Sequence, residues 1–418
     1  MQLTQMDLDS TSVLPSSEDS EFVCSAQDVI TIKFVSGENE MASSPEFTPQ
    51  FVHQHFGENE TIFGYKGLDI TLYYTDASMY IYTEIKFDTQ IKKSEDVEAD
   101  DIVEKLRAQL PSCQIDMMTT SRDKFRYYLE RQKTFKPFGE LLAKFTTNGK
   151  ELQMWKMLGS SKDFDNYLAR VQTLALWYID AANYTDNDDP RWMHYFLYEA
   201  TKSTEDGNYR YKLAGYCSIV NFYCYPEKIR PRIAQIMLLP PYRRVGNGPK
   251  FLDAIYNDIV PMPNVKDITV EDPADEFIHL RDFLDCRNCS KLIEFSPDKL
   301  REGYCDSMKS AALLKLKINP RQSRRVYEIL RLMTINPLNT EEMKAYRLDV
   351  KQRLNRPFKK SAKDWRKLRN ALDERQLAAV TAVETKDEQR MQLLQQMFEQ
   401  AVADYKIVIS RLKVYSSS

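Results

Sequence analysis

Hydrophobic and polar positions in the first part of the chain follow two different periods. Alternation of period two is typical of strands that bury one face, and spacing of three and four is typical of amphipathic helices. The strand-like runs are Asp28–Val35, Asp69–Tyr74 and Met79–Phe87, and the helix-like runs are Asp100–Leu110 and Ser121–Glu130. We therefore expect a small α+β domain over residues 28–135, preceded by a mobile, Ser- and acid-rich tail over residues 1–27.

The middle of the chain continues this mixture at greater length. A long helical pattern over residues 163–183 precedes four strand-like runs, and a helix, a strand and a second helix follow them. The four runs are 192–198, 209–218, 220–225 and 232–239, and the later elements are 249–258, 266–270 and 274–286. Antiparallel strands combined with helices in this order predict a second α+β domain over residues 136–295.

From residue 296 onwards the pattern is helical only, which predicts a helical domain over residues 296–418. Asn319–Pro320 and Asn336–Pro337 mark helix boundaries within it. Near its end, apolar residues recur at alternating gaps of three and four: Met391, Leu394, Phe398, Ala401, Tyr405, Val408 and Leu412. Because this coiled-coil-like seam lasts barely three heptads, we expect it to pack within the helical domain rather than to dimerise.

Length and composition agree with a soluble protein of two or three domains. The 418 residues exceed what one hydrophobic core holds, and 43% hydrophobic with 28% charged residues is ordinary for globular proteins. We expect neither a transmembrane helix nor a secretory signal, because no long apolar run occurs and the N-terminus lacks a basic start. Seven cysteines without an export signal predict reduced thiols in the cytoplasm or nucleus.

The formal net charge of −3 is unevenly distributed. Residues 1–298 carry a net charge of −15, which favours a basic partner, whereas residues 299–369 carry +13. The basic segment is open to three interpretations: a solvated helical face, a nuclear-import signal or a nucleic-acid contact. Its most basic stretch contains only Phe358 and Trp365 as aromatic residues, so base stacking and direct nucleic-acid binding are not expected.

Most enzyme and metal signatures are absent from the sequence. It contains no GxxxxGK[ST] phosphate loop, no HExxH zinc helix and no GxSxG nucleophile elbow. Cys286 and Cys289 form a CxxC pair, but no fourth zinc ligand follows at matching spacing. The four histidines are interpreted as structural or surface residues, and no metal is expected: His53, His55, His194 and His279.

The most informative stretch is an apolar strand that runs into a glycine turn and then into a helix. Ile233–Leu239 is followed by Arg243, Arg244, Gly246 and Gly248. Glycines allow close backbone approach, and the free N–H groups of a helix start attract anions such as a pyrophosphate. Two glycines alone would also suit a plain strand-to-helix corner, so these residues leave both interpretations open.

The spacing Arg243-x-x-Gly246-x-Gly248 resembles the R/Q-x-x-G-x-G/A signature of the GCN5-related N-acetyltransferases. This resemblance implies that the loop binds the pyrophosphate of acetyl-CoA and that the preceding strand pairs with the pantetheine arm. The implied cofactor-binding residues are Ile236, Met237, Leu238, Arg243, Arg244, Val245, Gly246, Asn247, Gly248 and Pro249, with Phe283 near the cofactor. Pro249 departs from the family's pattern and has no N–H to offer a phosphate.

Longer blocks resemble the family of type B histone acetyltransferase catalytic subunits. They run in order over about three quarters of the chain: FGENETIFGYKGL (56–68), VEADDI (97–102), FKPFG (135–139), RWMHYFLYE (191–199), ITVEDP (268–273), LRDF (280–283), RRVYEILRL (324–332) and YRLDVKQRL (346–354). The resemblance implies an α+β GCN5-related acetyltransferase fold with a further N-terminal α+β domain and a C-terminal all-helical domain. It also implies a protein-lysine acetyltransferase of the EC 2.3.1.48 type.

Acetyl transfer requires a neutral amine, whereas a free lysine is almost entirely charged at neutral pH. No histidine lies near the glycine loop in sequence, so a carboxylate, buried or beside a like charge, is the natural general base. From the residues alone, Glu271 at the end of a predicted strand could be this base, or Asp272 and Pro273 could simply begin a helix. The resemblance assigns the base to Glu271, with Asp272 as a capping and supporting carboxylate. It also makes Asp180 a helper, where the family has glutamate, and leaves Phe283 either near the cofactor or a core aromatic.

The same resemblance implies contacts with a histone tail. The matching positions are Glu58, Asn59 and Glu60 in an acidic turn, Trp192, and the segment Val220, Asn221 and Phe222. Without the family, a charged turn and a half-buried tryptophan would more often be structural. Val220 departs from the family's aromatic preference, which is expected to weaken stacking but to leave backbone pairing intact.

The implied reaction is direct acetyl transfer from acetyl-CoA to tail lysines of newly synthesised, free histone H4, as used in chromatin assembly. The implied partners are a histone H3–H4 pair and a WD40-repeat histone-binding subunit. Two other functions stay open: a catalytically weak module that binds histone tails, and an acetyltransferase for non-histone protein lysines. The presence of both Glu271 and the glycine loop favours the histone acetyltransferase.

Overall fold

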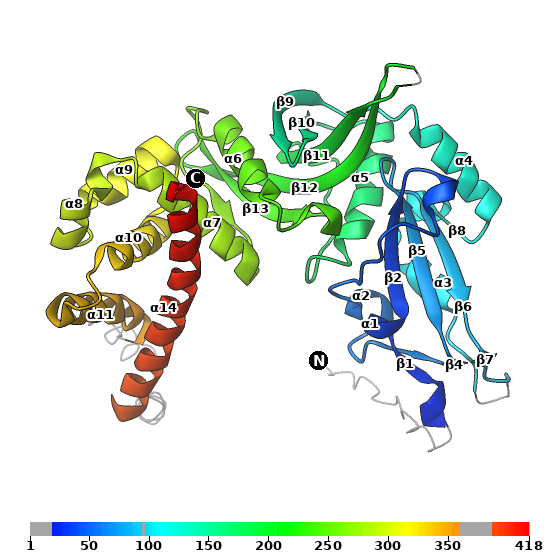
Figure 1. Ribbon diagram of the computed structural model, residues 1–418, viewed down its shortest axis with the longest axis horizontal. Helices are drawn as coiled ribbons and strands as arrows, with labels where there is room; N and C mark the ends of the chain where they lie inside the picture. Colours follow the sequence, from blue (N-terminus) through cyan, green and yellow to red (C-terminus); the bar gives the residue numbers. More distant parts are fainter. Residues whose placement is uncertain (1–18, 94–96, 205, 359–386, 418) are drawn as a thin grey trace, which may run out of the picture. The chain divides into compact units, whose positions relative to one another are not determined.

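The computed structural model describes residues 19–93, 97–204, 206–358 and 387–417. The chain divides into two compact units, whose elements are labelled in Figure 1. Unit 1 is Met1–Asn221 with Ile233–Ala254, and unit 2 is Phe222–Arg232 with Ile255–Ser418. The units are thus interleaved along the chain, unlike the three consecutive domains expected from the sequence.

A four-stranded mixed sheet forms one core of unit 1. Its strands are β2 (Ile30–Val35), β5 (Asp69–Thr75), β6 (Ile81–Lys86) and β8 (Met118–Thr119), in the order β2-β5-β6-β8. β2 and β5 are parallel, β5 and β6 antiparallel, and β6 and β8 parallel. α4 (Arg122–Gln132) packs on the sheet, because Phe125 and Leu129 share a buried cluster with Tyr73 and Tyr82. The strands expected at 28–35, 69–74 and 79–87 are confirmed.

Residues 19–27 belong to unit 1 rather than to a tail. β1 (Val23–Ser25) pairs antiparallel with β3 (Thr61–Phe63), and the Ala26 N–H donates to the Glu60 carbonyl at 2.8 Å. The expectation of a mobile tail is therefore wrong for residues 19–27, and residues 1–18 lie outside the described residues. The other small elements here are η1 (Asp19–Phe22), α1 (Ala26–Val29), η2 (Glu38–Glu40), α2 (His53–Phe56), β4 (Tyr65–Lys66), β7 (Thr89–Gln90), α3 (Ile102–Ala108) and η3 (Ser112–Met117).

The second sheet has six strands in the order β14-β13-β12-β11-β10-β9. They are β9 (Glu140–Thr147), β10 (Lys150–Leu158), β11 (Trp192–Lys202), β12 (Tyr209–Cys224), β13 (Lys228–Leu238) and β14 (Thr269–Val270). The hairpin of β9 and β10 was not expected, although Asn148-Gly149 between them, both with positive φ, is a strong hairpin signal. β12 is one continuous strand where the alternation predicts two, and β14 is shorter than the predicted strand 266–270.

α5 (Lys162–Ala175) covers part of this sheet within unit 1. The Phe164 ring meets the Phe196 ring edge-on at 6.0 Å, and the Tyr198 hydroxyl donates to the Tyr167 hydroxyl at 2.8 Å. The helix ends at Ala175 and not at residue 183 as predicted. The Trp177 carbonyl explains the early end, since it accepts the N–H groups of residues 50 and 51 instead of one from a further helical turn.

The described part of unit 2 beyond β14 is helical, as predicted from residue 296. Its helices are α7 (Asp275–Cys289), α8 (Pro297–Glu302), α9 (Asp306–Leu316), α10 (Pro320–Thr334), α11 (Thr340–Leu354) and α14 (Asp387–Ser417). Asn319 and Asn339 cap α10 and α11, because their side chains accept the N–H groups of Gln322 and Glu342. The remaining elements of the chain are α6 (Asn247–Ile259) and the short helices η4 (Pro240–Tyr242), η5 (Ile293–Phe295) and η6 (Arg356–Phe358).

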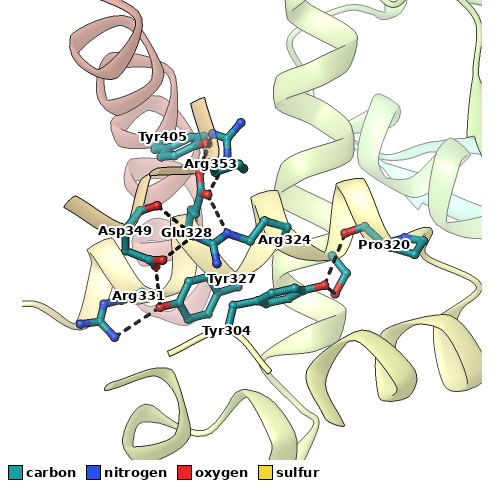
Figure 2. A network of polar contacts seen from close by, with 10 residues as sticks. Tyr304, Pro320, Arg324, Tyr327, Glu328, Arg331, Asp349, Arg353 and Tyr405 are labelled. Carbon is teal, nitrogen blue, oxygen red and sulfur yellow. Dashed lines mark hydrogen bonds and ion pairs between the residues drawn. The ribbon is translucent and has the colours of Figure 1, made fainter. Parts of the chain in front are cut away.

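The apolar seam of α14 packs inside unit 2. Leu394, Phe398, Tyr405, Val408 and Leu412 are all buried, which confirms the predicted internal packing, whereas Met391 is 67% exposed. A network of polar contacts joins α14 to α10 and α11, as Figure 2 shows. Buried Glu328 of α10 meets arginines from α10 and α11 and the Tyr405 hydroxyl of α14. One carboxylate therefore ties three helices together.

Candidate active site

The glycine turn joins β13 to α6 with an unusual backbone. Arg244 and Gly246 have φ angles of +61° and +87°, values that glycine tolerates and an arginine adopts only under constraint. The buried Asn247 amide donates to the Tyr242 carbonyl at 3.1 Å, while its Oδ1 has no hydrogen-bond partner among the described residues. The turn thus presents a helix N-terminus and a strained backbone, features that cluster at anion-binding sites.

Arg243 anchors the glycine turn to unit 1. Its Nε donates to the Leu238 carbonyl at 2.7 Å, and a terminal nitrogen donates to Gln50 Oε1 at 3.3 Å. The guanidinium also lies 4.8 Å from the centre of the Tyr178 ring. Arg243 therefore positions the turn from inside, whereas the side chains of Arg244 and Val245 are exposed.

The strand segment predicted to pair with pantetheine approaches β12 closely. Met237 is buried, and Ile236 and Leu238 are partly exposed. A Cβ atom at Gly215 of β12 would lie only 2.7 Å from the Leu238 side chain and 3.0 Å from the Met237 carbonyl oxygen. Glycine at 215 therefore allows the two strands to come together behind the turn. Gly248 and Pro249, the first residues after Asn247 in α6, are partly exposed.

The segment after α5 is locked to α2. The Gln50 and Phe51 N–H groups donate to the Trp177 carbonyl, and Gln54 donates to the Ala182 carbonyl at 2.9 Å. The His55 ring stacks on the Trp177 ring at 3.9 Å with an interplanar angle of 3°. Burial, and then the nearby charge of His53, lower the pKa of His55 to about 3, so this histidine is neutral and structural.

These contacts between α2 and the segment after α5 bring two predicted site residues, Glu60 and Asp180, close to His53. His53 Nε2 lies 3.5 Å from Asp180 Oδ1, and His53 Nδ1 lies 3.8 Å from Glu60 Oε1. Asp180 follows α5 in a turn and is not at a helix end as predicted, and its side chain is 70% exposed. Glu58 and Asn59 are exposed in the adjoining turn. The turn begins at Gly57 and ends at Glu60, and both of these residues have positive φ. The predicted acidic turn and the predicted helper carboxylate are therefore neighbours.

Trp192 and Val220 are paired directly across β11 and β12. Val220 is buried, so its side chain is not open to a substrate, whereas Asn221 and Trp192 are partly exposed. Trp192 lines a small pocket with Gly159, Phe164, Asp165, Asn187, Asp189 and His194. Burial lowers the pKa of His194 to about 4, which makes it a neutral wall of this pocket.

Glu271 and Asp272 follow β14 in unit 2. Asp272 has a φ of +27° and does not cap α7, whose N-cap is Ala274 without a side-chain hydrogen bond; the predicted capping role is wrong. The Glu271 side chain is 51% exposed, so the burial expected of the base is not found. Its Oε1 lies 4.0 Å from a terminal nitrogen of Arg232, which is a weak ion pair at this exposure.

Phe283 is a core residue of unit 2. It is buried on α7, and its ring meets the Tyr415 ring of α14 edge-on at 5.9 Å. Of the two roles considered from the sequence, this packing supports the core aromatic.

The described residues contain no cluster of three or more potential metal ligands. Cys286 and Cys289 are buried free thiols, and burial raises the pKa of both. Among the same described residues, no helix has the length and apolar character needed to cross a bilayer.

Two residues were missed in the sequence as parts of this region. His53 stands between Glu60 and Asp180, and Arg232 stands beside Glu271. The sequence offered only weak signals for them, a histidine at the start of HQHF and an arginine in RPRI. Each has a neighbour that is distant along the chain, Asp180 for His53 and Glu271 for Arg232.

The strand, the glycine turn of positive φ and the helix start of unit 1 form a corner suited to binding an anion, as expected of an acetyltransferase that uses acetyl-CoA. Two family descriptions match the sequence: "Histone acetyl transferase HAT1 N-terminus" over residues 22–180, and "Histone acetyltransferase type B catalytic subunit, C-terminal" over residues 281–332. The chain belongs to the family of histone acetyltransferase type B catalytic subunits.

The relatives of that name cover most of the chain. The human one is 35% identical over 94% of this chain and 94% of its own length. One from Cryptococcus neoformans is 30% identical over 87% and 89%, and one from Dictyostelium discoideum is 33% identical over 74% and 64%. Among solved structures, an aminoglycoside acetyltransferase from a soil metagenomic sample covers 31% of this chain and 83% of its own, at 14% identity and a TM-score of 0.22.

Proposed function

We propose that this protein transfers acetyl from acetyl-CoA to lysines in the N-terminal tail of newly synthesised, free histone H4. The observation that carries the proposal is the strained glycine turn at the start of α6, in a chain whose relatives are named histone acetyltransferases. We further propose that the substrate is an H3–H4 pair presented by a WD40-repeat subunit, and that the enzyme works in both cytoplasm and nucleus.

The residues of the turn fit acetyl-CoA. The N–H groups at the start of α6 suit a pyrophosphate, the exposed Arg244 adds positive charge, and Asn247 Oδ1 is a buried acceptor without a partner among the described residues. Pro249 removes one N–H from this set. Ile236, Met237 and Leu238 would pair with the pantetheine arm, and acetyl-CoA supplies the activated acetyl thioester.

The chain supplies the proton transfer. Glu271 accepts a proton from the lysine ammonium, and the neutral amine then attacks the thioester carbonyl. The new C–N bond forms as the C–S bond breaks, and the departing thiolate takes up the proton lost by the amide nitrogen. Because Glu271 is half exposed in the free protein, exclusion of water around it would have to come from the bound substrate.

Carboxylates of unit 1 suit a lysine- and arginine-rich tail. Glu58, Glu60 and Asp180 lie near one another and are wholly or partly exposed. The net charge of −15 over residues 1–298 adds a long-range attraction for a basic protein. Trp192 and Asn221 would offer an aromatic surface and a strand edge to the same tail.

A parallel assay tests this proposal. Labelled acetyl-CoA is offered with free H4, with nucleosomes and with spermidine, using the wild type and the double variant Glu58→Gln, Glu60→Gln. We expect label on free H4 and little on the other two. In the double variant we expect the KM for H4 to rise about tenfold and the KM for acetyl-CoA to stay the same. Glu104→Gln, an exposed charge loss on α3, is the matched control.

The other outcomes separate the alternatives. Binding of H4 without any transfer of label would favour the tail-binding module. Equal label on H4 and on unrelated lysine-rich proteins would favour an acetyltransferase for non-histone lysines. An unchanged KM for H4 in the double variant would remove the acidic turn from the substrate site while leaving the reaction itself intact.

A further inference from the structure

Three residues of unit 2 lie in or next to three neighbouring strands of the six-stranded sheet, and the middle one contacts the other two. Phe222 is near the end of β12, Arg232 is in β13, and Glu271 directly follows β14. The strands are adjacent in the order β14-β13-β12. The Thr269 hydroxyl of β14 donates to the Pro231 carbonyl of β13 at 3.4 Å, which places the end of β14 beside Arg232.

Arg232 contacts both of the others. Its guanidinium carbon lies 4.7 Å from the centre of the Phe222 ring, and its terminal nitrogen lies 4.0 Å from Glu271 Oε1. Its Nε is buried and has no hydrogen-bond partner among the described residues. The guanidinium thus lies over the Phe222 ring and at the limit of ion-pair distance from the Glu271 carboxylate.

We propose that Arg232 is a positioning residue for Glu271, and that it links the base to Phe222, a residue predicted to contact the tail. The inference rests on the proposed function, in which Glu271 is the base. Arg232 fixes the direction of the Glu271 carboxylate, because a guanidinium that lies over the Phe222 ring offers its N–H groups in one orientation. A tail that lies on Phe222 also restricts the guanidinium, so substrate binding and orientation of the base become coupled.

None of the other charged residues described below takes the place of Arg232 beside Glu271. Arg230 of β13 is engaged by Asp267, with Nε to Oδ1 at 2.5 Å. Asp272, Asp275 and Glu276, which follow Glu271 along the chain, are exposed side chains of the same charge as Glu271 and offer it no attraction. Arg232 therefore opposes the negative charge of the segment that carries the base.

The test compares Arg232→Gln and Arg232→Lys with the wild type, Glu271→Gln and the exposed control Lys266→Gln. We measure kcat and KM for an H4 tail peptide and for acetyl-CoA between pH 6 and 9, together with the thermal unfolding temperature. For Arg232→Gln we expect kcat to fall about tenfold, with the KM for acetyl-CoA unchanged. We also expect the unfolding temperature to stay close to that of the wild type, because the ion pair with Glu271 is half exposed.

Arg232→Lys keeps the charge but not the planar contact with Phe222. We therefore expect its kcat to lie between those of Arg232→Gln and the wild type. Lys266→Gln should leave kcat and the unfolding temperature unchanged. The comparison of kcat with KM and with the unfolding temperature matters because a merely structural role of Arg232 would change stability without lowering kcat of the folded protein.

The outcomes distinguish this inference from the proposed function. If Glu271→Gln is inactive while folded Arg232→Gln keeps the wild-type kcat, the positioning role is wrong and the base stands. If Glu271→Gln keeps the wild-type rate, the base assignment itself fails. If Arg232→Gln does not fold, an unchanged kcat in Arg232→Lys would still overturn the proposal.

Discussion

Two glutamates of unit 2 each face arginine side chains, yet their surroundings are opposite. Glu328 is fully buried and accepts from Arg324 at 2.9 Å, from Arg353 at 2.6 Å and from Tyr405 at 2.8 Å (Figure 2). Glu271 is half exposed and has Arg232 at 4.0 Å. The same side chain is thus a helix connector in one place and an accessible carboxylate in the other.

The difference shows what separates a structural carboxylate from a reactive one. Burying Glu328 costs solvation, which its close, multiple partners offset, and those partners hold it in one geometry. The network extends further, since Arg324 also meets Asp349 at 2.8 Å and the Tyr327 hydroxyl donates to Asp349 at 3.1 Å. Burial and then the charge of Asp349 raise the pKa of Tyr327 to about 12, so its hydroxyl keeps its proton. A loosely held, exposed Glu271 can instead meet a substrate.

The largest effect is expected from Glu271→Gln, which tests the reactive side of the comparison. Loss of a general base should reduce the acetylation rate about 10²–10⁴-fold, measured with labelled acetyl-CoA and an H4 peptide. The unfolding temperature should not change, because the side chain is exposed and weakly paired. Glu276→Gln, an exposed glutamate of α7, should keep the wild-type rate. A fully active Glu271→Gln would move the base elsewhere, with Asp180 or Asp272 to be tested next.

Glu328→Ala tests the structural side. It leaves two arginines without their buried partner, so we expect the free energy of unfolding to fall by about 3–5 kcal/mol. Urea unfolding followed by helical circular dichroism measures this. Glu341→Ala, at an exposed position of α11, should change it by no more than about 0.5 kcal/mol. If both variants had equal stability, the network would contribute nothing.

Tyr405→Phe sharpens the comparison by removing a single contact from Glu328. The hydroxyl donates to a buried carboxylate, so its loss should cost about 2 kcal/mol of unfolding free energy. The same urea titration applies. Tyr415→Phe, on the same helix but exposed, should be close to neutral. A neutral Tyr405→Phe would mean that the arginines alone satisfy Glu328.

The smallest effect on stability is expected at Asp285, a buried carboxylate whose arginine partner lies farther away than those of Glu328. Asp285 of α7 is buried, its Oδ2 lies 3.4 Å from Arg281 Nε, and burial raises the pKa of Asp285 to about 6. Because this value lies above the unfolded one of about 3.9, its stabilising contribution is complete below pH 4 and is lost as the pH rises through 6. Relative to Asp285→Asn, the wild type should lose about 1–2 kcal/mol of unfolding free energy between pH 4 and pH 7.

Unfolding titrations of both proteins at four pH values check this prediction. Parallel stability curves for the wild type and Asp285→Asn would show that Arg281 keeps Asp285 ionised throughout. Asp285 would then be a fully paired carboxylate like Glu328, and not an intermediate case between Glu328 and Glu271.

Much of the fold and part of the candidate site could be predicted from hydrophobic periodicity and local motifs. The alternation of Asp28–Val35 and the seam of α14 correctly indicated a strand and a buried helix face. The length of α5 could not be read from spacing, because its end depends on contacts of the Trp177 carbonyl with residues 50 and 51. The hairpin at Asn148-Gly149 was predictable and was overlooked. His53 and Arg232 had no distinctive local signal.

The sequence by itself determined the mixed α+β and helical organisation, the division into acidic and basic parts, the glycine turn and the family. These are local spacings or sums along the chain, and they do not depend on what lies next to a residue in space. Only the tertiary structure decided that Glu328 is buried among arginines, that Glu271 is exposed beside Arg232, and that His53 stands between Glu60 and Asp180. Burial and charge pairing arise from contacts between distant segments, and those contacts determine what a carboxylate can do.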